Sequence, residues 1–269
     1  MNALIELKQV TKTYRIGKDI EVHALRGLSL SIATGEFVAI MGPSGSGKST
    51  LLAILGLLDK ADAGEYLLLG QNISRLGESD YAKLRNRFFG FVFQTFNLLP
   101  KLNIADNTLL PFIYSDAATK AKRQAAIDIL KQIGLGARLR HRPNGLSGGQ
   151  QQRGALARAL ANEPLVILAD EPTGNLDTAA SQEIMQLLKK LNDQGNTIIM
   201  VTHEAEIAAW ATRDIHLRDG RIVSDVRKKE ITAREMPKVS LKGKKRRILS
   251  FLSFKNYAGE AYLSIANNK

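Results

Sequence analysis

The sequence contains no cysteine, which excludes disulfide bonds and thiolate metal sites. Long apolar runs are also missing, because the longest stretches, such as residues 51–58, fall well short of the roughly 18 residues of a membrane span. Residues 1–8 lack the basic and apolar pattern of a secretory leader. These absences predict a soluble chain in a reducing compartment, on the cytoplasmic side of any membrane that it serves.

Acidic residues are in deficit, since 26 Asp and Glu against 38 Lys and Arg give a net charge of +12. Residues 226–269 hold 12 basic and 3 acidic residues, whereas residues 1–225 carry a net charge of only +3. The basic character therefore belongs to the tail, which argues against a body that binds nucleic acid. With 269 residues, 44% of them hydrophobic, the chain can form one large or two modest domains.

One glycine-rich segment organises the chain. Residues 42–49, GPSGSGKS, fit the pattern G-x-x-x-x-G-K-[ST] and follow the apolar run 37–41. Glycines let the backbone curl with its N–H groups inward, and the positive end of a helix over 50–55 adds to this anion site. Lys48 is placed to reach the β- and γ-phosphates, and Ser49 to bind Mg²⁺. A chance glycine-rich turn is the alternative, which the strand before and the helix after disfavour. The predicted nucleotide contacts are Gly42, Pro43, Ser44, Gly45, Ser46, Gly47, Lys48, Ser49 and Thr50.

The N-terminal region is patterned as strands. Residues 3–10 and 24–32 form two predicted strands around a loop that contains Gly17, and Leu28, Leu30 and Ile32 recur at period 2. We expect an antiparallel layer beside the nucleotide core. Tyr14 lies just beyond the first strand, where an aromatic ring can stack on an adenine. The alternative is a surface or hairpin tyrosine.

The middle of the chain predicts short strands around a helical insertion. Strands are expected at 64–70 and 90–94, the second ending on Gln94, with a capped helix start at Ser79 between them. Residues 95–145 form the insertion, within a helical subdomain of about 95–160. A helix over 117–133 is expected there, with its apolar positions at Ala121, Ala125, Ile129 and Ile133, and another helix at 151–161.

Two carboxylates end a buried strand at 165–171, whose continuous apolar composition is typical of parallel strands. Asp170 is placed to hold Mg²⁺ through water and Glu171 to polarise an attacking water, although such a pair alone is more often a solvated turn.

A helix at 178–191, a strand at 197–201 leading to His203, and a hairpin at 214–226 follow. A lone histidine there is usually structural. The alternation predicts an α/β fold with a parallel, doubly wound sheet.

Six motifs occur in the order and approximate spacing of the nucleotide-binding domain of ATP-binding cassette (ABC) transporters. They are the phosphate loop 42–49, Gln94, the segment LSGGQ at 146–150, Asp170 with Glu171, residues 175–177, and His203. LSGGQ is specific to this superfamily, whereas many NTPases share the phosphate loop. The resemblance covers residues 1 to about 225. It implies a P-loop NTPase core with an antiparallel β layer and a helical subdomain.

The resemblance also implies roles for these residues. ATP would bind between two such domains arranged head to tail, with Tyr14 stacked on adenine. Mg²⁺ would be held by Ser49, Gln94 and Asp170. The implied catalytic residues are Glu171 as the base, His203 and Gln94. Ser147 and Gly149 would contact the γ-phosphate bound to the opposite subunit, and Asp177 would lie at the seam. A glycine-rich segment that begins a helix can bind an anion. Residues 146–150 are such a segment, so they offer a second anion site for which the same chain holds no second nucleotide.

Finer resemblance points to a subfamily. Residues 93–100, 170–177 and 201–204 resemble the group of MacB-type macrolide exporters and LolD-type lipoprotein-release ATPases, with Leu102-Asn103 a minor departure from its pattern. This implies a homodimer that drives a transmembrane permease, fused in cis or separate in trans, on the cytoplasmic face of the inner membrane. A cell-division ABC ATPase shares every catalytic residue, and a soluble nucleic-acid-associated ABC ATPase is a weaker rival.

The tail predicts membrane contact. Residues 226–247 are expected to form a basic linker, and residues 248–269 a helix with one apolar face. Such a pair would lie on an anionic membrane surface, although packing against the domain is an alternative. The tail also resembles the lead-in to the first span of fused MacB-type proteins. We therefore hypothesise that the chain is the N-terminal part of a longer ATPase-permease. The apolar face of the helix predicted at 248–269 comprises Phe254, Tyr257, Ala258, Ala261, Tyr262 and Ile265.

Overall fold

The computed structural model describes residues 3–17, 20–114 and 119–229, with the side chains of Ile16 and Tyr114 left out. The described residues belong to a single compact unit, residues 1–237. The predicted linker at 226–247 and helix at 248–269 lie outside the described residues, apart from positions 226–229. Strand β10 covers the first two of these, so the expected boundary at residue 225 falls just inside a strand.

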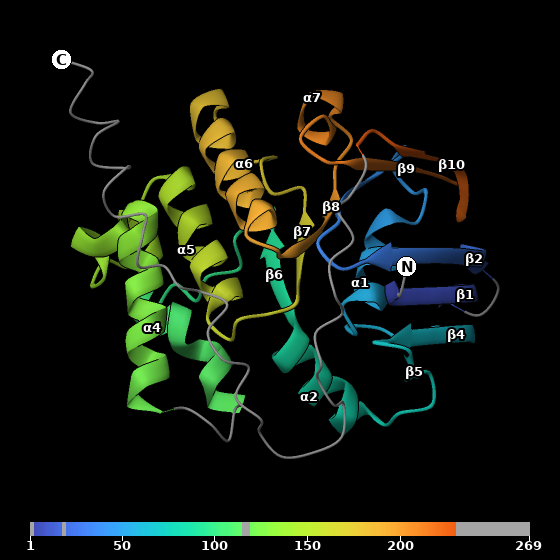
Figure 1. Cartoon of the computed structure of the whole chain (residues 1–269), viewed down its shortest axis with the longest axis horizontal. Helices are drawn as coiled ribbons and strands as arrows, with labels where there is room; N and C mark the ends of the chain where they lie inside the picture. The colour runs from blue at the N-terminus through green and yellow to red at the C-terminus, as the bar shows by residue number, and fades with distance from the viewer. Residues whose placement is uncertain (1–2, 18–19, 115–118, 230–269) are drawn as a thin grey trace. The chain divides into compact units, whose positions relative to one another are not determined.

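A six-stranded sheet forms the centre of this unit, in the order β10-β9-β3-β8-β7-β6 (Figure 1). The five strands from β9 to β6 are parallel, and only β10 is antiparallel, after a tight turn at Asp219 and Gly220. The predicted parallel sheet is therefore confirmed. The strands are β3 (Phe37–Met41), β6 (Phe89–Phe93), β7 (Val166–Asp170), β8 (Thr197–Val201), β9 (Arg213–Arg218) and β10 (Arg221–Arg227).

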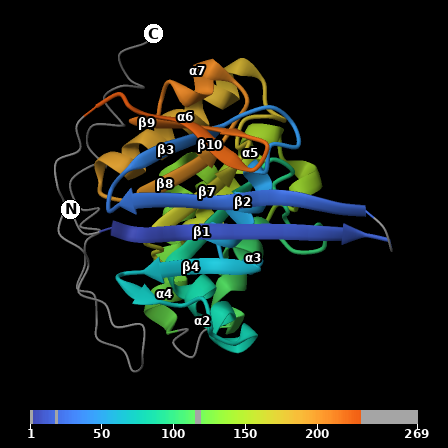
Figure 2. The same ribbon diagram turned by 90° about the vertical axis from the view of Figure 1, so that its right-hand side faces the viewer.

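A second, antiparallel sheet has the order β2-β1-β4-β5 (Figure 2). Its strands are β1 (Ala3–Ile16), β2 (Ile20–Ala33), β4 (Ala63–Leu68) and β5 (Gln71–Asn72). The predicted layer is confirmed, but its predicted strand ends at residues 10 and 24 are wrong. The hairpin continues until Ile16 pairs with Ile20, so Tyr14 lies inside β1, opposite Val22. Burial patterning missed this part because its side chains are mostly exposed and backbone pairing holds it together.

Helices cover the six-stranded sheet and build the insertion. They are α1 (Lys48–Leu55), α2 (Glu78–Phe88), α3 (Ile104–Leu109), α4 (Lys120–Leu130), α5 (Gly148–Leu160), α6 (Thr178–Asp193) and α7 (Ala205–Ala208). Short 3₁₀ or π turns occupy Leu110–Tyr114, Lys131–Leu135, Gly136–Arg138 and Pro143–Gly145. In Figure 1, α4 and α5 lie beyond β6, whereas β1 and β2 lie at the opposite side. The helical insertion is confirmed.

Helix α6 packs against the sheet with Ile184, Met185 and Leu188, which share a hydrophobic core cluster with Ile198 and Met200 of β8. This packing fixes the sheet, whose carboxyl edge carries the candidate site. Each helix among the described residues is too short or too polar to span a membrane.

Three helix details differ from the prediction. The capped start at Ser79 is wrong, because α2 begins at Glu78 after Gly77 and has no side-chain cap there. Helix α5 begins at Gly148 instead of 151, because Ser147 caps it. The apolar face predicted for residues 117–133 is wrong in its first half, because Ala121 and Ala125 are exposed and Ala126 is buried instead. Its second half is confirmed, since Ile129 and Ile133 pack against the cluster that contains Leu130. Contacts with α3 and α5 select that face.

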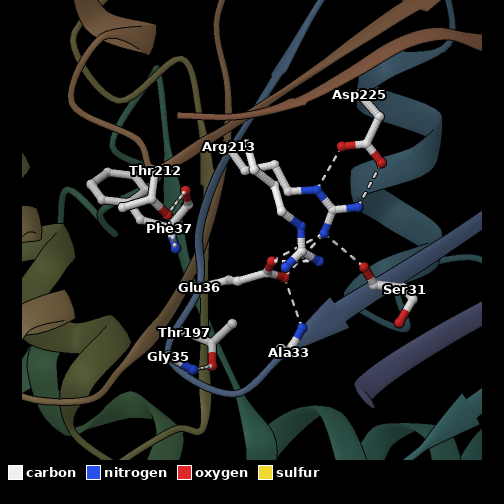
Figure 3. A network of polar contacts seen from close by, with 10 residues as sticks. Ser31, Ala33, Gly35, Glu36, Phe37, Thr197, Thr212, Arg213 and Asp225 are labelled. Carbon is white, nitrogen blue, oxygen red and sulfur yellow. Dashed lines mark hydrogen bonds and ion pairs between the residues drawn. The ribbon is translucent and has the colours of Figure 1, made fainter. Parts of the chain in front are cut away.

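Buried charges join the two sheets (Figure 3). Glu36, in the turn before β3, is fully buried, and Arg213 of β9 donates to it from Nη1 at 3.1 and 3.2 Å. The same guanidinium donates to Asp225 of β10 at 2.7 Å twice, and to the Ser31 carbonyl oxygen at 2.8 Å. Arg227 lies 3.3 Å from Glu36. The β9–β10 hairpin is thus bound to the β2–β3 turn.

Candidate active site

Four neighbouring strands end at the same level. Ile40 of β3 pairs with Val201 of β8, Val201 with Asp170 of β7, and Asp170 with Phe93 of β6. The residues that follow these positions therefore emerge side by side at the carboxyl edge, where ligands of open α/β sheets bind. They are the phosphate loop after β3, His203 after β8, Glu171 after β7 and Gln94 after β6.

The phosphate loop has the conformation that its glycines allow. Gly42 and Gly47 have φ of 150° and 100°, and a Cβ would lie 2.1 Å from the Leu217 carbonyl oxygen at Gly42 and 2.4 Å from the Ala24 carbonyl oxygen at Gly47. The Gly220 N–H donates to the Ser46 carbonyl oxygen at 3.1 Å, so the β9–β10 hairpin supports the loop. These positions require glycine for both conformation and space.

The loop also leaves polar groups available to an anion. Helix α1 starts after Gly47 without a side-chain cap, and its first N–H groups have no partner within the helix. The Ser46 hydroxyl is buried and has no hydrogen-bond partner among the described residues. Lys48 Nζ donates to the Gly42 and Pro43 carbonyl oxygens, both at 2.8 Å, which holds the ammonium at the loop. Donors, dipole and charge therefore suit a phosphate group.

Glu171 and His203 are brought together across β7 and β8. His203 Nδ1 lies 2.9 Å from Glu171 Oε1, and the histidine side chain is exposed. Glu171 has φ of 44°, an uncommon conformation for a residue with a side chain, and its N–H donates to the Val201 carbonyl oxygen at 3.0 Å. Such strain costs about 1–3 kcal/mol and is often found at functional sites. The sequence placed both residues at strand ends but did not predict this contact.

Asp170 lies partly buried beside them. Burial raises the pKa of Asp170 above its ordinary value, the negative charge of Glu171 raises it further, and Lys48 opposes both. A cation bound nearby would favour the ionised form. Carboxylate, amide and hydroxyl oxygens of Asp170, Gln94 and Ser49 are the kind of ligand that Mg²⁺ prefers, so this donor set fits the metal.

Gln94 is held by the loop that follows Glu171. The Asn175 side-chain amide donates to the Gln94 carbonyl oxygen at 3.0 Å, and a Cβ at Gly174 would lie 2.7 Å from Gln94 Nε2. The buried Gln152 of α5 donates to the carbonyl oxygens of Phe93 and Pro172, which flank Gln94 and Glu171 respectively. Sequence reasoning missed Gln152, because a glutamine in an amphipathic helix gives no signal of what it contacts.

The LSGGQ segment opens α5 with a capping box. The Gln150 N–H donates to Ser147 Oγ at 3.3 Å, and the Ser147 N–H donates to Gln150 Oε1 at 3.1 Å. Gly149 packs on α6, since a Cβ there would lie 2.9 Å from Ala180 Cβ. Helix α5 contacts β6, whereas the phosphate loop follows β3, three strands away. The structure therefore does not bring Ser147 to the phosphate loop of its own chain.

Two further predicted residues lie outside this row of strand ends. Asp177 is exposed and caps α6, accepting a hydrogen bond from the Ala180 N–H at 2.8 Å. Tyr14 is 37% exposed on β1, and its hydroxyl donates to Asp59 Oδ2 at 2.8 Å. Nothing in the sequence pattern indicated Asp59 as the partner of Tyr14, because Asp59 lies 45 residues further along the chain, in the turn after α1.

Comparison with known proteins identifies the family. The sequence pattern of the family described as ABC transporter matches residues 25–174. An uncharacterised ABC transporter ATP-binding protein of Thermotoga maritima is 52% identical over 222 residues, which cover 82% of this chain and 94% of that protein.

Longer relatives match as well. The macrolide export ATP-binding/permease protein MacB of Chlorobium phaeobacteroides is 57% identical over 86% of this chain and 35% of its own length. MacB of Chlorobaculum tepidum is 49% identical over 99% of this chain and 41% of its own length. The chain thus spans well under half the length of these two relatives.

A solved structure has the same fold. It is described as the dimeric post-hydrolysis state of the ATP-binding cassette MJ0796 bound to ADP and Pi, and it matches with a TM-score of 0.77 and 45% identity, covering 84% of this chain and all of that one. Given the family match over more than half of the sequence, the near-complete coverage of the T. maritima relative and this fold, the chain belongs to the ABC transporter family and forms one of its ATP-binding, ATP-hydrolysing domains.

Proposed function

We propose that two copies of this domain bind two ATP molecules with Mg²⁺ between them and drive a membrane permease of the MacB-like export or lipoprotein-releasing type. The names of the relatives support the export assignment, since two of them are described as macrolide export ATP-binding/permease proteins. The observation that carries the proposal is the row of strand ends holding Lys48, His203, Glu171 and Gln94, with the Glu171–His203 contact of 2.9 Å at its centre.

In this proposal the phosphates lie on residues 42–50. Lys48 turns from the loop carbonyls to the β- and γ-phosphate oxygens, which are stronger partners for its charge. Tyr14 stacks on the adenine. Mg²⁺, when bound, neutralises charge on the phosphate oxygens, and Ser49, Gln94 and Asp170 are the residues that would hold it. The unpaired Ser46 hydroxyl and the uncapped start of α1 support an anion at this place.

We assign hydrolysis to Glu171, which follows β7, and His203, which follows the neighbouring strand β8. Glu171 orients the attacking water and accepts its proton, a role that a carboxylate at the same sheet edge as the phosphate loop can fill. His203 contacts the γ-phosphate and, through the 2.9 Å hydrogen bond from Nδ1, keeps the Glu171 carboxylate aimed at the water.

The dimer follows from the distance between the two glycine-rich segments. Neighbouring strands lie about 4.8 Å apart, so β3 and β6 are separated by roughly 14 Å. Helix α5 packs on β6, so one γ-phosphate at residues 42–49 cannot also contact Ser147 and Gly149 of the same chain. A head-to-tail partner supplies them instead, with Asp177 at the seam. The dimeric description of the MJ0796 cassette supports this arrangement.

The permease partner places the domain at the cytoplasmic face of the inner membrane, where ATP is available. The MacB relative of C. tepidum aligns over 267 residues, which includes most of the basic tail. We propose that the tail lies on an anionic membrane surface beside the permease. Sequencing the gene beyond Lys269 distinguishes a permease fused in cis from one encoded separately.

The test is Glu171→Gln in the full chain, incubated with Mg-ATP and analysed by light scattering coupled to size exclusion. We expect ATP binding to persist, the rate of hydrolysis to fall by about 10²- to 10⁴-fold, and a nucleotide-bound dimer to accumulate. Glu206→Gln, an exposed glutamate in α7, is the matched control and should leave turnover and assembly unchanged.

Normal turnover by Glu171→Gln would remove Glu171 from its assigned role. A Glu171→Gln protein that binds ATP but stays monomeric at every concentration would contradict the shared site. Ser147→Arg adds an independent check, because it should block the dimer while leaving the ATP affinity of the monomer within about twofold of the parent protein.

A further inference from the structure

The Tyr14 side chain lies on an exposed hairpin, but polar contacts hold it in one orientation. Its hydroxyl donates to Asp59 Oδ2 at 2.8 Å, and Asp59 lies in the turn that follows α1. The Asp59 N–H in turn donates to the Ala53 carbonyl oxygen of α1 at 3.3 Å. The ring is thereby attached to the helix that follows the phosphate loop.

Asp59 is itself held in one orientation. Its Oδ1 accepts hydrogen bonds from Lys12 Nζ and from the Lys60 N–H, both at 2.7 Å, so Oδ2 is left to face the phenol. Lys12 Nζ also donates to the Lys60 carbonyl oxygen at 2.8 Å. Partial burial works to raise the pKa of Asp59, but hydrogen bonds from Lys12 and Tyr14 outweigh it and lower the pKa, so Asp59 is ionised near neutral pH.

Lys12 occupies one side of the ring. Its ammonium lies over the Tyr14 ring, 5.2 Å from the centroid, in a cation–π contact. Tyr14 as a whole residue nevertheless remains 37% exposed. Tyr14 is therefore held at its hydroxyl by Asp59 and contacted on its ring by Lys12, while exposed surface remains for a flat ligand.

We propose that Asp59 is a positioning residue for the nucleotide base: it sets the plane of the Tyr14 ring before ATP arrives. The inference rests on the proposed function, in which Tyr14 stacks on adenine. A ring that is already ordered loses little conformational entropy when a base stacks on it, so binding is tighter. Asp59 would thus affect only the affinity for the base, and would do so by orienting Tyr14. The affinity for the phosphates depends on other residues.

If the same contacts only stabilised the fold, their loss would have a different effect on ligand binding. The Lys12–Asp59 ion pair also joins β1 to the turn after α1, and its loss could loosen the fold as a whole. General loosening would weaken binding of every ligand at the phosphate loop. A positioning role weakens only ligands that carry a base, and that difference decides between the two.

The experiment measures affinities of the full chain for ATP and for inorganic triphosphate by calorimetry without Mg²⁺, which prevents hydrolysis. Asp59→Ala and Tyr14→Phe should each bind ATP about threefold to tenfold more weakly, the size of one side chain's ordering cost, with triphosphate affinity unchanged. Tyr14→Phe removes the hydrogen bond between the Tyr14 hydroxyl and Asp59 but keeps the ring and Asp59 itself. It therefore tests this hydrogen bond even if Asp59→Ala fails to fold. Glu65→Ala, an exposed acid on β4, is the matched control and should change neither affinity.

Two further measurements isolate the route through Tyr14. In a Tyr14→Ala background, adding Asp59→Ala should cause no further loss of ATP affinity. In steady-state turnover with Mg²⁺, Asp59→Ala should raise KM for ATP while kcat stays within about twofold, because the chemistry at Glu171 is untouched.

The inference is overturned if Asp59→Ala weakens ATP and triphosphate equally, or if the two substitutions add in full. It is also overturned if Tyr14→Ala loses ATP affinity but Asp59→Ala and Tyr14→Phe do not, a result that leaves the proposed function standing. Unchanged ATP affinity in Tyr14→Ala would instead refute base stacking by Tyr14 in the proposed function, and this inference with it.

Discussion

Replacing Arg213 with methionine should destabilise the domain strongly. Arg213 has 5% of its side chain exposed and donates to Glu36, Asp225 and the Ser31 carbonyl oxygen. Methionine fills a similar volume but supplies no donor and no charge. Among the described residues, the fully buried Glu36 carboxylate would then keep the Ala33 N–H at 2.7 Å and the half-exposed Arg227 at 3.3 Å as its remaining partners.

The expected magnitude follows from that loss. Breaking a buried ion pair by removing one partner costs about 3–5 kcal/mol, because the remaining charge is uncompensated. Arg227 offsets part of this, so we expect the free energy of unfolding to fall by about 3 kcal/mol. Asp225→Asn should cost less, about 1 kcal/mol, because Asp225 is 39% exposed and water can replace part of its interaction.

Urea unfolding followed by far-UV circular dichroism measures this difference. With a slope of roughly 3 kcal/mol per molar, the midpoint of Arg213→Met should drop by about 1 M relative to the parent protein. Arg218→Met is the matched control, because Arg218 lies on the same strand with 73% of its side chain exposed, and its midpoint should not move. Equal midpoints for Arg213→Met and Arg218→Met would refute the assignment of stability to the buried network.

The same network has a pH signature. Hydrogen bonding to Arg213 lowers the pKa of Asp225 below its ordinary value, although partial burial opposes this. Its stabilisation is therefore complete above the unfolded-state pKa of about 3.9 and is lost as the pH falls through the lower folded-state pKa. Arg213→Met should remove this part of the acid dependence, and an unchanged acid profile would contradict it.

Two predictions concern the phosphate loop. Lys48→Ala should weaken ATP binding by about 10- to 100-fold in calorimetry, because a charge-assisted hydrogen bond to phosphate is lost; Lys83→Ala, an exposed lysine of α2, should not, and equal affinities would contradict the phosphate assignment. Gly47→Ala should lower the free energy of unfolding by about 2 kcal/mol more than Gly45→Ala, in thermal melts. Both glycines have positive φ, but only a Cβ at Gly47 meets a backbone oxygen, at 2.4 Å, so equal melting temperatures would refute the steric argument.

Much of the fold could be predicted from the sequence because its signals are local. The apolar runs of β3, β7 and β8 gave strand positions within one or two residues, and Asp219 with Gly220 gave the hairpin. Prediction failed where no burial signal exists, as in the exposed ends of β1 and β2. It also failed where packing selects a face, as at the start of α4, where Ala126 is buried and the expected Ala121 and Ala125 are exposed.

The candidate site divides in the same way. The sequence placed Gln94, Glu171 and His203 at strand ends, and the register of β6, β7 and β8 brings those ends together. Which side chains then touch could not be predicted. The Glu171–His203 contact depends on β8 lying between β3 and β7, and the clamp of Gln152 on the Phe93 and Pro172 carbonyl oxygens depends on how α5 packs.

The sequence by itself determined the chemistry available to this protein: a phosphate loop, acidic and histidine residues after buried strands, and a second glycine-rich helix start, each encoded within a few neighbouring residues. Only the tertiary structure decided the partners, such as Asp59 for Tyr14 and Arg213 for Glu36, which lie 45 and 177 residues apart. The physical reason is that strand order and helix packing are set by burial of the whole core, and no local pattern specifies which distant groups that burial brings into contact.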